Sequence, residues 1–360
     1  MQMNFDMESD TARVVAIKVV GVGGGGGNAV NHMVDCNIGS VEFISVNTDK
    51  QALLTSRATQ KISIGDKLTK GRGAGGDPSV GQRAGEESRE EIAAALKGAQ
   101  MVFVTAGMGG GTGTGAASII AEVSREIGAL TIGIVTKPFN FEGKHRMEQA
   151  ESGILALREH VDALIVIPNE RLKSVSDQKI TFLNAFACAD DVLRQGVQSI
   201  SDLINVSGLI NLDFSDVCSV MRDAGVAHMG TGRAAGEDKA EKATKMAISS
   251  PLLETSIDGA HRVIVNITAC PDISLDEIDA ATTMIHDACA DDVNLIFGVA
   301  LDENMKDELA ITVIATGFDD NQKKPSSVPD FVKFQFDNDD TPDTGSFLDD
   351  DLMKLFNENK

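Results

Sequence analysis

AGMGGGTGTGAA, residues 106–117, is the most informative stretch of the chain, and it contains the run GGGTGTG from Gly109 to Gly115. It follows the apolar run MVFVT at 101–105 and leads into ASIIAEVSREI at 117–127, whose apolar residues have helical spacing. In a glycine-rich turn between a strand and a helix, backbone N–H groups close on an anion and the helix N-terminus adds partial positive charge. The run therefore predicts a loop that holds nucleotide phosphates, not a flexible linker.

A second glycine cluster, GVGGGGGNAV from Gly21 to Val30, also lies between a predicted strand and a predicted helix. It contains the spacing GxGxxG at Gly21, Gly23 and Gly26, and Asp49 follows at the distance of a ribose-binding acid in dinucleotide-binding folds. An NAD-dependent oxidoreductase with a Rossmann-like loop is therefore an alternative. Two glycine loops, however, could hold a pyrophosphate from both sides, and hydride transfer does not need the second one. The sequence contains no GxxxxGK[ST], so no P-loop lysine is available.

Short apolar runs alternate with longer helical ones in the first half of the chain, the pattern of βαβ units and a mostly parallel sheet. The predicted strands are 14–20, 41–46, 101–105, 131–135 and 163–167. Residues 182–205 have apolar positions at helical spacing, which predicts one helix about 36 Å long. In the second half, helices are predicted near 216–223, 237–249 and 275–290, and strands at 262–268, 294–300 and 310–315.

The predicted fold class is α/β, with a parallel-sheet nucleotide-binding domain joined by a long central helix to a second, smaller α/β domain. A disordered acidic C-terminal tail is expected to follow. A chain of 360 residues with 42% hydrophobic content is long enough for two cores of ordinary size. The expected segments are a flexible N-terminal segment at 1–12, the nucleotide-binding domain at 13–181, the central helix at 182–206, the C-terminal domain at 207–318, a linker at 319–346 and a partner-binding segment at 347–360.

Composition excludes several classes of partner. The net charge of -22 argues against polyanions, so we expect no nucleic-acid binding. No uncharged run approaches the roughly 20 residues that span a bilayer, which predicts a cytoplasmic protein without direct membrane insertion. The five cysteines are scattered and have no CxxC spacing, so neither disulfides nor a zinc site is indicated. We expect these thiols to be reduced and mostly buried.

Four further segments accompany GGGTGTG in a specific order along the chain. They are VNTDKQAL at 46–53, GRGAGGDPSVG at 71–81, TKPFNFEGKHR at 136–146 and INLDFSDV at 210–217. Together the five segments resemble the tubulin/FtsZ family of GTPases, in a match that runs from Arg13 to Phe318. The resemblance implies an assembly-dependent GTPase that converts GTP to GDP and polymerises head to tail into the cytokinetic ring at the bacterial division site. A tubulin-like protein that serves another polymer, such as one for plasmid segregation, is a second alternative.

The resemblance also implies which residues contact GTP. The α- and β-phosphates are expected between the two glycine loops, with residues 74–76 over the γ-phosphate and with Glu142 and Arg146 at ribose and phosphate. A surface ion pair between Glu142 and Arg146 is the alternative. The full set of expected contacts is Gly23, Gly24, Gly25, Gly26, Gly27, Asn28, Asn47, Asp49, Ala74, Gly75, Gly76, Gly107, Gly109, Gly110, Gly111, Thr112, Gly113, Thr114, Pro138, Glu142, Arg146, Phe186 and Asp190.

Phe186 and Asp190 lie one turn apart on the predicted long helix and share a face. A base can stack on the ring while the carboxylate accepts hydrogen bonds from guanine N1–H and the amino group, which adenine lacks at those positions. Asn28 adds further polar contacts, so GTP is expected rather than ATP. The alternative is that Phe186 lies in the core and Asp190 on a solvated face.

The expected catalytic residues are Asn211, Asp213 and Asp216 in INLDFSDV. Carboxylates that orient water suit phosphoryl transfer, where catalysis is mostly positioning and electrostatics. Because these residues follow the long helix, we expect them not to reach the nucleotide of their own chain. The resemblance implies that they act on the GTP of the neighbouring subunit. An N-cap role for Asp213 or Ser215 at the next helix is compatible with this expectation.

The expected cofactors are GTP or GDP, Mg²⁺ bound mainly through the phosphates, and K⁺ as a candidate activating cation. No side chain is assigned as a metal ligand, although Asp77 is expected close enough to the triphosphate for an indirect contact. The tail contains two imperfect versions of the family's partner-binding motif, VPDFVK at 328–333 and FLDDDLMKLF at 347–356. We expect division-site membrane tethers and regulators to bind there, at midcell on the inner face of the membrane.

Overall fold

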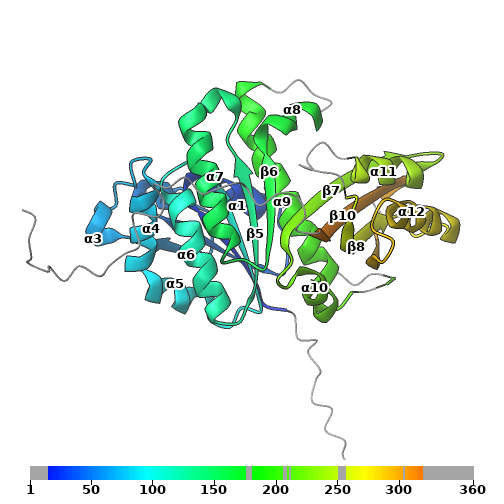
Figure 1. Cartoon of the computed structure of the whole chain (residues 1–360), viewed down its shortest axis with the longest axis horizontal. Coiled ribbons are helices and arrows are strands. Elements are labelled where there is room, and N and C mark those ends of the chain that lie inside the picture. Colours follow the sequence, from blue (N-terminus) through cyan, green and yellow to red (C-terminus); the bar gives the residue numbers. More distant parts are fainter. Residues whose placement is uncertain are drawn as a thin grey trace, which may run out of the picture. The chain divides into compact units, whose positions relative to one another are not determined.

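The computed structural model describes residues 15–175, 181–205, 209–210, 212–249, 257–302 and 305–318. The expected N-terminal segment, the tail with its two candidate motifs, and Asn211 lie outside these ranges. The described residues belong to one compact unit that ends at Phe318. Figure 1 shows its helices and strands in chain order from blue to orange.

The described residues form a ten-stranded sheet with the order β3-β2-β1-β4-β5-β6-β7-β10-β8-β9. The strands are β1 (Ile17–Val22), β2 (Val41–Asn47), β3 (Gln60–Ser63), β4 (Met101–Gly107), β5 (Leu130–Lys137), β6 (Ala163–Pro168), β7 (Gly225–Ala235), β8 (Ala260–Ala269), β9 (Asn294–Leu301) and β10 (Glu308–Phe318). All neighbours from β3 to β7 run parallel. β10 lies antiparallel between β7 and β8, and β9 is parallel to β8.

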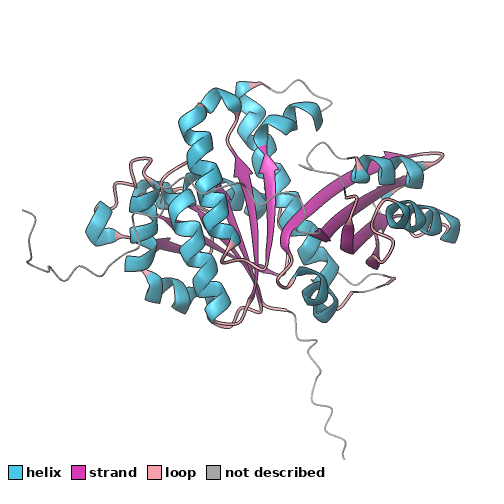
Figure 2. Cartoon of the chain, viewed as in Figure 1, coloured by secondary structure: helices cyan, strands magenta, loops and turns pink. Residues whose placement is uncertain are grey.

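Helices cover both faces of the parallel strands (Figure 2). They are α1 (Gly23–Asp35), α2 (Lys50–Leu54), α3 (Asp66–Thr69), α4 (Pro78–Glu87), α5 (Arg89–Leu96), α6 (Thr112–Glu126), η1 (Asn140–Glu142), α7 (Lys144–Arg158), η2 (Asn169–Arg171), α8 (Leu172–Val175), α9 (Phe182–Asn205), α10 (Phe214–Met221), α11 (Lys239–Ile248) and α12 (Leu275–Asp287). One hydrophobic core joins α4, α5, α6 and α7 to the sheet, and another joins α1, α9 and α10 to its opposite face. This mixed α/β, mostly parallel, two-domain fold confirms the predicted fold class.

The central parallel strands are apolar almost without interruption because helices cover both of their faces. Every residue of β4 up to Ala106 is buried, and Phe103 is among the largest fully buried side chains. Each of the five strands predicted in this half is present, with both ends within three residues of the expected positions. The parallel register brings the ends of β1, β4 and β5 to one edge of the sheet, where the glycine turns begin.

Helix α9 has the bounds that its apolar spacing predicted. Its stripe, which includes Ala189, Leu193, Val197 and Ile200, is buried in the core shared with α1 and the parallel strands. That core also contains Ile314 of β10, so α9 packs against strands of both halves of the chain. The helix therefore connects the two domains through one continuous packed layer.

The C-terminal domain contains the three strands and three helices predicted for it, and also one strand that was not predicted. β7 contains three glycines and has no clean alternation of apolar residues, so its sequence does not predict the 11-residue strand that it forms. β10 pairs with it along most of its length. Helix α10 begins at Phe214, two residues before the prediction, because Asp213 caps it. The antiparallel placement of β10 could not be inferred from strand spacing.

The cysteines were expected to be mostly buried, and this is wrong. All five are free thiols, but Cys36 is exposed and the others, Cys188, Cys218, Cys270 and Cys289, are only partly buried. Among the described residues, no helix combines the length and the apolar character needed to cross a bilayer.

Close packing of α11 on β7 yields a testable consequence. A Cβ atom at Gly232 would lie 1.9 Å from the Ala243 carbonyl oxygen, so Gly232→Ala should lower the free energy of unfolding by about 1–3 kcal/mol. Gly39 is exposed and a Cβ there meets nothing within 4 Å. Gly39→Ala should therefore change the free energy of unfolding by less than about 0.5 kcal/mol. Urea titration of both variants measures the difference. Equal stability of the two would contradict this packing.

Candidate functional site

A cavity of about 330 Å³ lies where the glycine turns meet the start of α9. It is bounded by the ends of β4 and β5, the first turns of α1 and α6, and residues of η1, η2, α7 and α9. Thirteen expected contacts line it: Gly24, Gly25, Asn28, Gly107, Gly110, Gly111, Thr112, Gly113, Pro138, Glu142, Arg146, Phe186 and Asp190. The cavity therefore brings together segments that are more than 150 residues apart in the sequence.

The two glycine loops touch each other through their backbones. A Cβ at Gly23 would lie 2.7 Å from the Gly113 nitrogen, and one at Gly25 would lie 3.1 Å from the Gly107 nitrogen. A larger residue at Gly23 would force the loops apart, and one at Gly25 would be tightly packed. Helices α1 and α6 both begin here without a side-chain cap and without an acidic residue in the first turn. Their first N–H groups are thus available to an anion, and both helix dipoles favour negative charge at this point.

The two threonines of GGGTGTG have different positions. Thr112 lines the cavity, and its hydroxyl shares a 2.7 Å hydrogen bond with the hydroxyl of Thr48. Thr114 does not line the cavity, because its hydroxyl accepts a hydrogen bond of 2.9 Å from the Gly109 N–H. Thr114 therefore shapes the loop from within.

Residues 74–76, expected over the γ-phosphate, lie beside the loop but do not line the cavity. A Cβ at Gly111 would lie 2.8 Å from the Ala74 Cβ, so this segment packs directly on the phosphate loop. Gly75 and Gly76 have φ angles of +63° and +79°, a conformation that favours glycine. Asp77 caps α4 through a bond from the Ser79 N–H, and hydrogen bonds from Ser79 lower its pKa. Its carboxylate is therefore occupied by the helix terminus.

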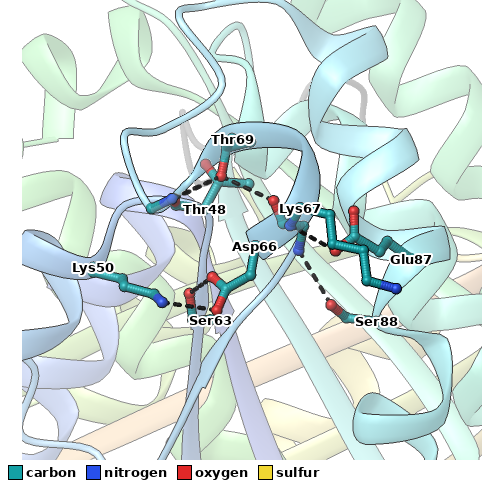
Figure 3. Close-up of polar contacts among 10 residues, drawn as sticks. Thr48, Lys50, Ser63, Asp66, Lys67, Thr69, Glu87 and Ser88 are labelled. Atoms are coloured by element: carbon teal, nitrogen blue, oxygen red, sulfur yellow. Dashed lines mark hydrogen bonds and ion pairs between the residues drawn. The ribbon is translucent and has the colours of Figure 1, made fainter.

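The segment that precedes residues 74–76 is held in place by the contacts in Figure 3. Asp66 at the start of α3 accepts hydrogen bonds from Lys50 and Ser63, each of 2.7 Å. The Thr69 hydroxyl donates to the Gly65 carbonyl, and the Gly73 N–H donates to the Thr48 carbonyl. A larger cavity of about 590 Å³ lies beside this segment, but none of the expected site residues lines it. Only the smaller cavity is lined by the glycine loops, so it is the candidate site.

At the base end of the cavity, Phe186 is 43% exposed and makes edge contacts with Phe139 and Phe141, with ring centroids 5.7 and 6.4 Å apart. It therefore does not lie in the core. Asp190 also lines the cavity, and burial raises its pKa to about 6, with His32 acting in the opposite direction. A solvated-face position for Asp190 is thus wrong. A flat ring and a partly desolvated carboxylate therefore both line this end of the cavity.

Glu142 and Arg146 line the cavity and also form an ion pair with each other. The Glu142 carboxylate additionally accepts a 2.9 Å bond from the Phe139 N–H. The ion pair considered as the alternative for these two residues is therefore present, and both residues also lie at the cavity. A phosphate would compete with Glu142 for the half-exposed guanidinium of Arg146.

Asn169 is a cavity residue that the sequence analysis missed. Its side chain is buried, and its Oδ1 is one of three buried side-chain polar atoms in the described part of the chain that have no hydrogen-bond partner. A buried acceptor without a donor is costly, so an N–H or O–H of a ligand would stabilise it. The signal was available, because the Pro168–Asn169 turn ends β6 at the same sheet edge as the glycine loops. Met108, Thr136, Ala189 and Leu193 also line the cavity and were not predicted.

Several expected contacts serve the structure around the cavity without lining it. Asp49 caps α2 through the Gln51 N–H, and Asn47 accepts from the Asp49 N–H, so neither faces the cavity. Gly26 packs so closely that a Cβ would lie 2.4 Å from the Thr105 carbonyl oxygen. Gly23, Gly27, Gly109, Thr114 and residues 74–76 likewise lie outside the lining.

The expected catalytic acids lie outside the cavity. Asp213 and Asp216 form a reciprocal capping box at the start of α10, in which each carboxylate accepts a hydrogen bond from the other residue's N–H, at 2.9 and 3.0 Å. The expected N-cap role of Asp213 is thus confirmed. Among the described residues, no group of three or more His, Cys, Asp or Glu side chains is placed to hold a metal ion.

Gly110 offers a clean test of the phosphate loop. A Cβ there meets no protein atom within 4 Å, so Gly110→Ser should fold normally, yet the residue lines the cavity. The added side chain should raise the Kd for GTP at least about tenfold, equal to about 1.4 kcal/mol. Equilibrium dialysis measures the change, with Gly39→Ser as the matched control. Unchanged affinity in Gly110→Ser would place the phosphates elsewhere.

Asp190 makes guanine binding depend on pH. Its pKa of about 6 means that the neutral acid predominates below pH 6, and only the carboxylate can accept both guanine donors. The Kd for GTP should therefore rise as pH falls from 7 to 5, approaching about tenfold per unit well below the pKa. Asp190→Asn should bind more weakly and lack this slope, whereas titration of the nucleotide phosphate affects both proteins equally. Identical pH profiles would exclude Asp190 as the cause.

Comparisons with known proteins agree with this geometry. The family model described as "Tubulin/FtsZ family, GTPase domain" matches residues 16–177, and that described as "FtsZ family, C-terminal domain" matches residues 225–319. The structure of an empty FtsZ dimer from M. jannaschii is 41% identical and has a TM-score of 0.80, over 84% of this chain and 88% of that chain. CetZ2 from Haloferax volcanii, in a GTPgS-bound protofilament, is 22% identical with a TM-score of 0.73 over 84% and 94% of the two chains, a likeness of fold alone.

The two family models leave only the start of the chain, the region around α9 and the tail unmatched. The GTPase model includes both glycine loops and the segment at 136–146 that borders the cavity. The chain therefore belongs to the tubulin/FtsZ family, whose GTPase domain binds GTP and GDP and hydrolyses GTP.

Proposed function

We propose that this chain is a self-assembling GTPase that polymerises head to tail into filaments, and that these filaments form the cytokinetic ring at a bacterial division site. The supporting observation is the separation of two sets of residues. Phe186 and Asp190 line the cavity in the first turns of α9, whereas Asp213 and Asp216 follow its last turn. From Asp190 to the end of α9 is about 22 Å of helix, and neither acid lines the cavity, which supports their acting away from the nucleotide of their own chain.

In the proposed reaction, the N–H groups of the two glycine loops hold the phosphates, and Arg146 adds positive charge. Asp190 and Asn169 bind the guanine and ribose end. Asp213 and Asp216 of the preceding or following subunit orient water for attack on the γ-phosphate, with Asn211 as a third candidate. Mg²⁺ would be bound mainly through the phosphates, and K⁺ is a candidate activating cation. Positioning and charge of this kind supply most of the catalysis in phosphoryl transfer.

Apolar side chains at both ends support head-to-tail contact. Phe141 of η1 is 54% exposed and its ring contacts Phe186 of the cavity, and Leu209 and Ile210 are 65% and 40% exposed just before the acids. Exposed apolar groups that gather beside functional residues are typical of interaction surfaces. A contact between two different faces does not close on itself, so it generates filaments.

The alternatives are less well supported. A Rossmann-type oxidoreductase would use Asp49 for ribose, but Asp49 caps α2 away from the cavity. A tubulin-like protein with another polymer role shares the fold, but identity is 41% to the FtsZ structure and 22% and 20% to CetZ2 and CetZ1. This difference favours the division role.

We also propose that membrane tethers and division regulators bind the tail, through 328–333 or 347–356, and that the protein concentrates at midcell on the inner face of the membrane. Both segments lie outside the described residues. The basis of this proposal is their sequence resemblance to the family's terminal motif.

A shared active site makes turnover depend on protein concentration. GTP turnover per molecule should be negligible below a critical concentration and reach a plateau above it, in step with light scattering. Turnover strictly proportional to protein concentration, down to dilute solution, would contradict the proposal.

Asp216→Asn separates charge from capping, because the amide oxygen can still accept the bond from the Asp213 N–H. We expect GTP affinity within about twofold of the original, with turnover above the critical concentration reduced by about 10²-fold or more. Ser215→Ala, an exposed change on the same turn, should leave both unchanged. Normal turnover by Asp216→Asn would remove the catalytic role of this acid.

A further inference from the structure

Helix α10 determines where the proposed catalytic acids stand. Asp213 and Asp216 are held to its first turn by their reciprocal hydrogen bonds, so they move with the helix. Val217, Val220 and Met221 bury its inner face. Figure 1 shows α10 at the end of α9 opposite α8. The contacts at its other end therefore set the position of both carboxylates.

A buried carboxylate of the nucleotide-binding domain lies at that other end. Asp162, 5% exposed and just before β6, accepts a 2.8 Å hydrogen bond from the Thr131 N–H of β5 and a 3.4 Å bond from the Asp223 N–H. Its own carbonyl accepts a 2.9 Å bond from the Gly225 N–H at the start of β7. One residue thus binds β5, the middle of the short segment that connects α10 to β7, and the first residue of β7.

The Arg125 guanidinium lies beside both Asp162 and Asp223. Arg125, in the last turn of α6, donates to the Asp223 carboxylate at 2.9 Å and lies 3.9 Å from Asp162 Oδ1. Asp223 itself has a φ angle of +48°, so its backbone conformation is one that needs support from its surroundings. The charge of Asp162 is accordingly balanced by an arginine and by two backbone N–H groups.

The C-terminal domain holds the same helix independently. Arg262 of β8 donates to the Ser219 carbonyl at 3.2 Å, and Thr316 of β10 donates to the Val220 carbonyl at 3.1 Å. Upstream of the acids, the Leu209 N–H donates to the Val299 carbonyl of β9 at 2.8 Å. Without the bond to Asp162, α10 would keep its contacts with this domain and lose a polar link to the nucleotide-binding domain.

We propose that Asp162 is a positioning residue for GTP hydrolysis, because it fixes α10, and with it Asp213 and Asp216, relative to the nucleotide-binding domain. This inference rests on the proposed catalytic role of the two acids. Asp162 touches no nucleotide, since it does not line the cavity. Replacing Asp162 should therefore lower the rate of GTP hydrolysis in the neighbouring subunit's site. Nucleotide binding to its own chain should stay unchanged.

The test is Asp162→Asn in the full chain, assayed for GTP turnover above the critical concentration. The asparagine has nearly the same volume, but an NH2 donor replaces one of the two carboxylate oxygens that accept separately from the Thr131 and Asp223 N–H groups. We expect kcat to fall about tenfold, as for loss of 1.4 kcal/mol, while KM and the Kd for GDP stay within about twofold. The matched control is Arg89→Gln, which removes an ion-pair network with Glu122 and Glu126 on α6 that is not linked to α10.

A double variant distinguishes this inference from the proposed function. If Asp162 acts through the acids, Asp162→Asn combined with Asp216→Asn should be no slower than Asp216→Asn alone. A further tenfold loss in the double variant, or equal losses in kcat and nucleotide affinity in the single one, would overturn the inference. So would normal turnover by folded Asp162→Asn beside an inactive Asp216→Asn. An active Asp216→Asn would instead overturn the proposed function, and this inference with it.

Should Asp162→Asn fail to fold, Arg125→Gln decides the question. The Arg125 side chain is 39% exposed, so its replacement should be tolerated. Loss of its bond to Asp223 should lower kcat severalfold with unchanged Kd for GDP. Turnover equal to that of the Arg89→Gln control would overturn the inference.

Discussion

The backbone contact between the two glycine loops is the constraint on which the rest of the structure depends. Gly23 lies so close to Gly113 that a Cβ atom would not fit, and Gly25 lies so close to Gly107 that a Cβ atom would be tightly packed. This contact aligns the N-termini of α1 and α6 at one sheet edge, where two helix dipoles and their first N–H groups favour an anion. Because β1, β4 and β5 run parallel as neighbours, both loops lie at that edge. Residues of α9 line the base end of the site.

Elements with strong local signals were predictable from the sequence. The bounds of α9 follow from one uninterrupted apolar stripe, and the central strands follow from apolar runs that end in glycine turns. β7 was missed because its glycines and polar residues give no periodicity, and its partner β10 lies some 75 residues further on. Pairing at such separation is a property of the packed fold. No local sequence pattern predicts which strand pairs with β7.

The candidate site also contains residues that the sequence predicted and residues that it did not. Phe186, Asp190 and many of the loop glycines were predicted from the family resemblance, which agrees with a chemical role for each, and they line one cavity. Asn169 follows β6 at the sheet edge of the glycine loops, but a lone asparagine after a strand has many uses, and its buried, unpartnered oxygen is what singles it out. Asp49 was expected at the nucleotide from the family resemblance and from its spacing after the first glycine cluster, although its carboxylate is used by the first turn of α2. Sequence spacing gives the position of a residue along the chain. It does not predict which backbone N–H its side chain will accept a hydrogen bond from.

Helix α6 has a further consequence. Its first residue, Thr112, lines the nucleotide cavity, and its last turn holds Arg125, which binds Asp223 beside α10. Fifteen residues of helix, about 22 Å, therefore connect the phosphate loop of one subunit to the segment that supports its acids. In a filament whose acids serve the next nucleotide, such a rigid connection would let the occupancy of one site influence hydrolysis at its neighbour, so that turnover could propagate along the polymer with a direction.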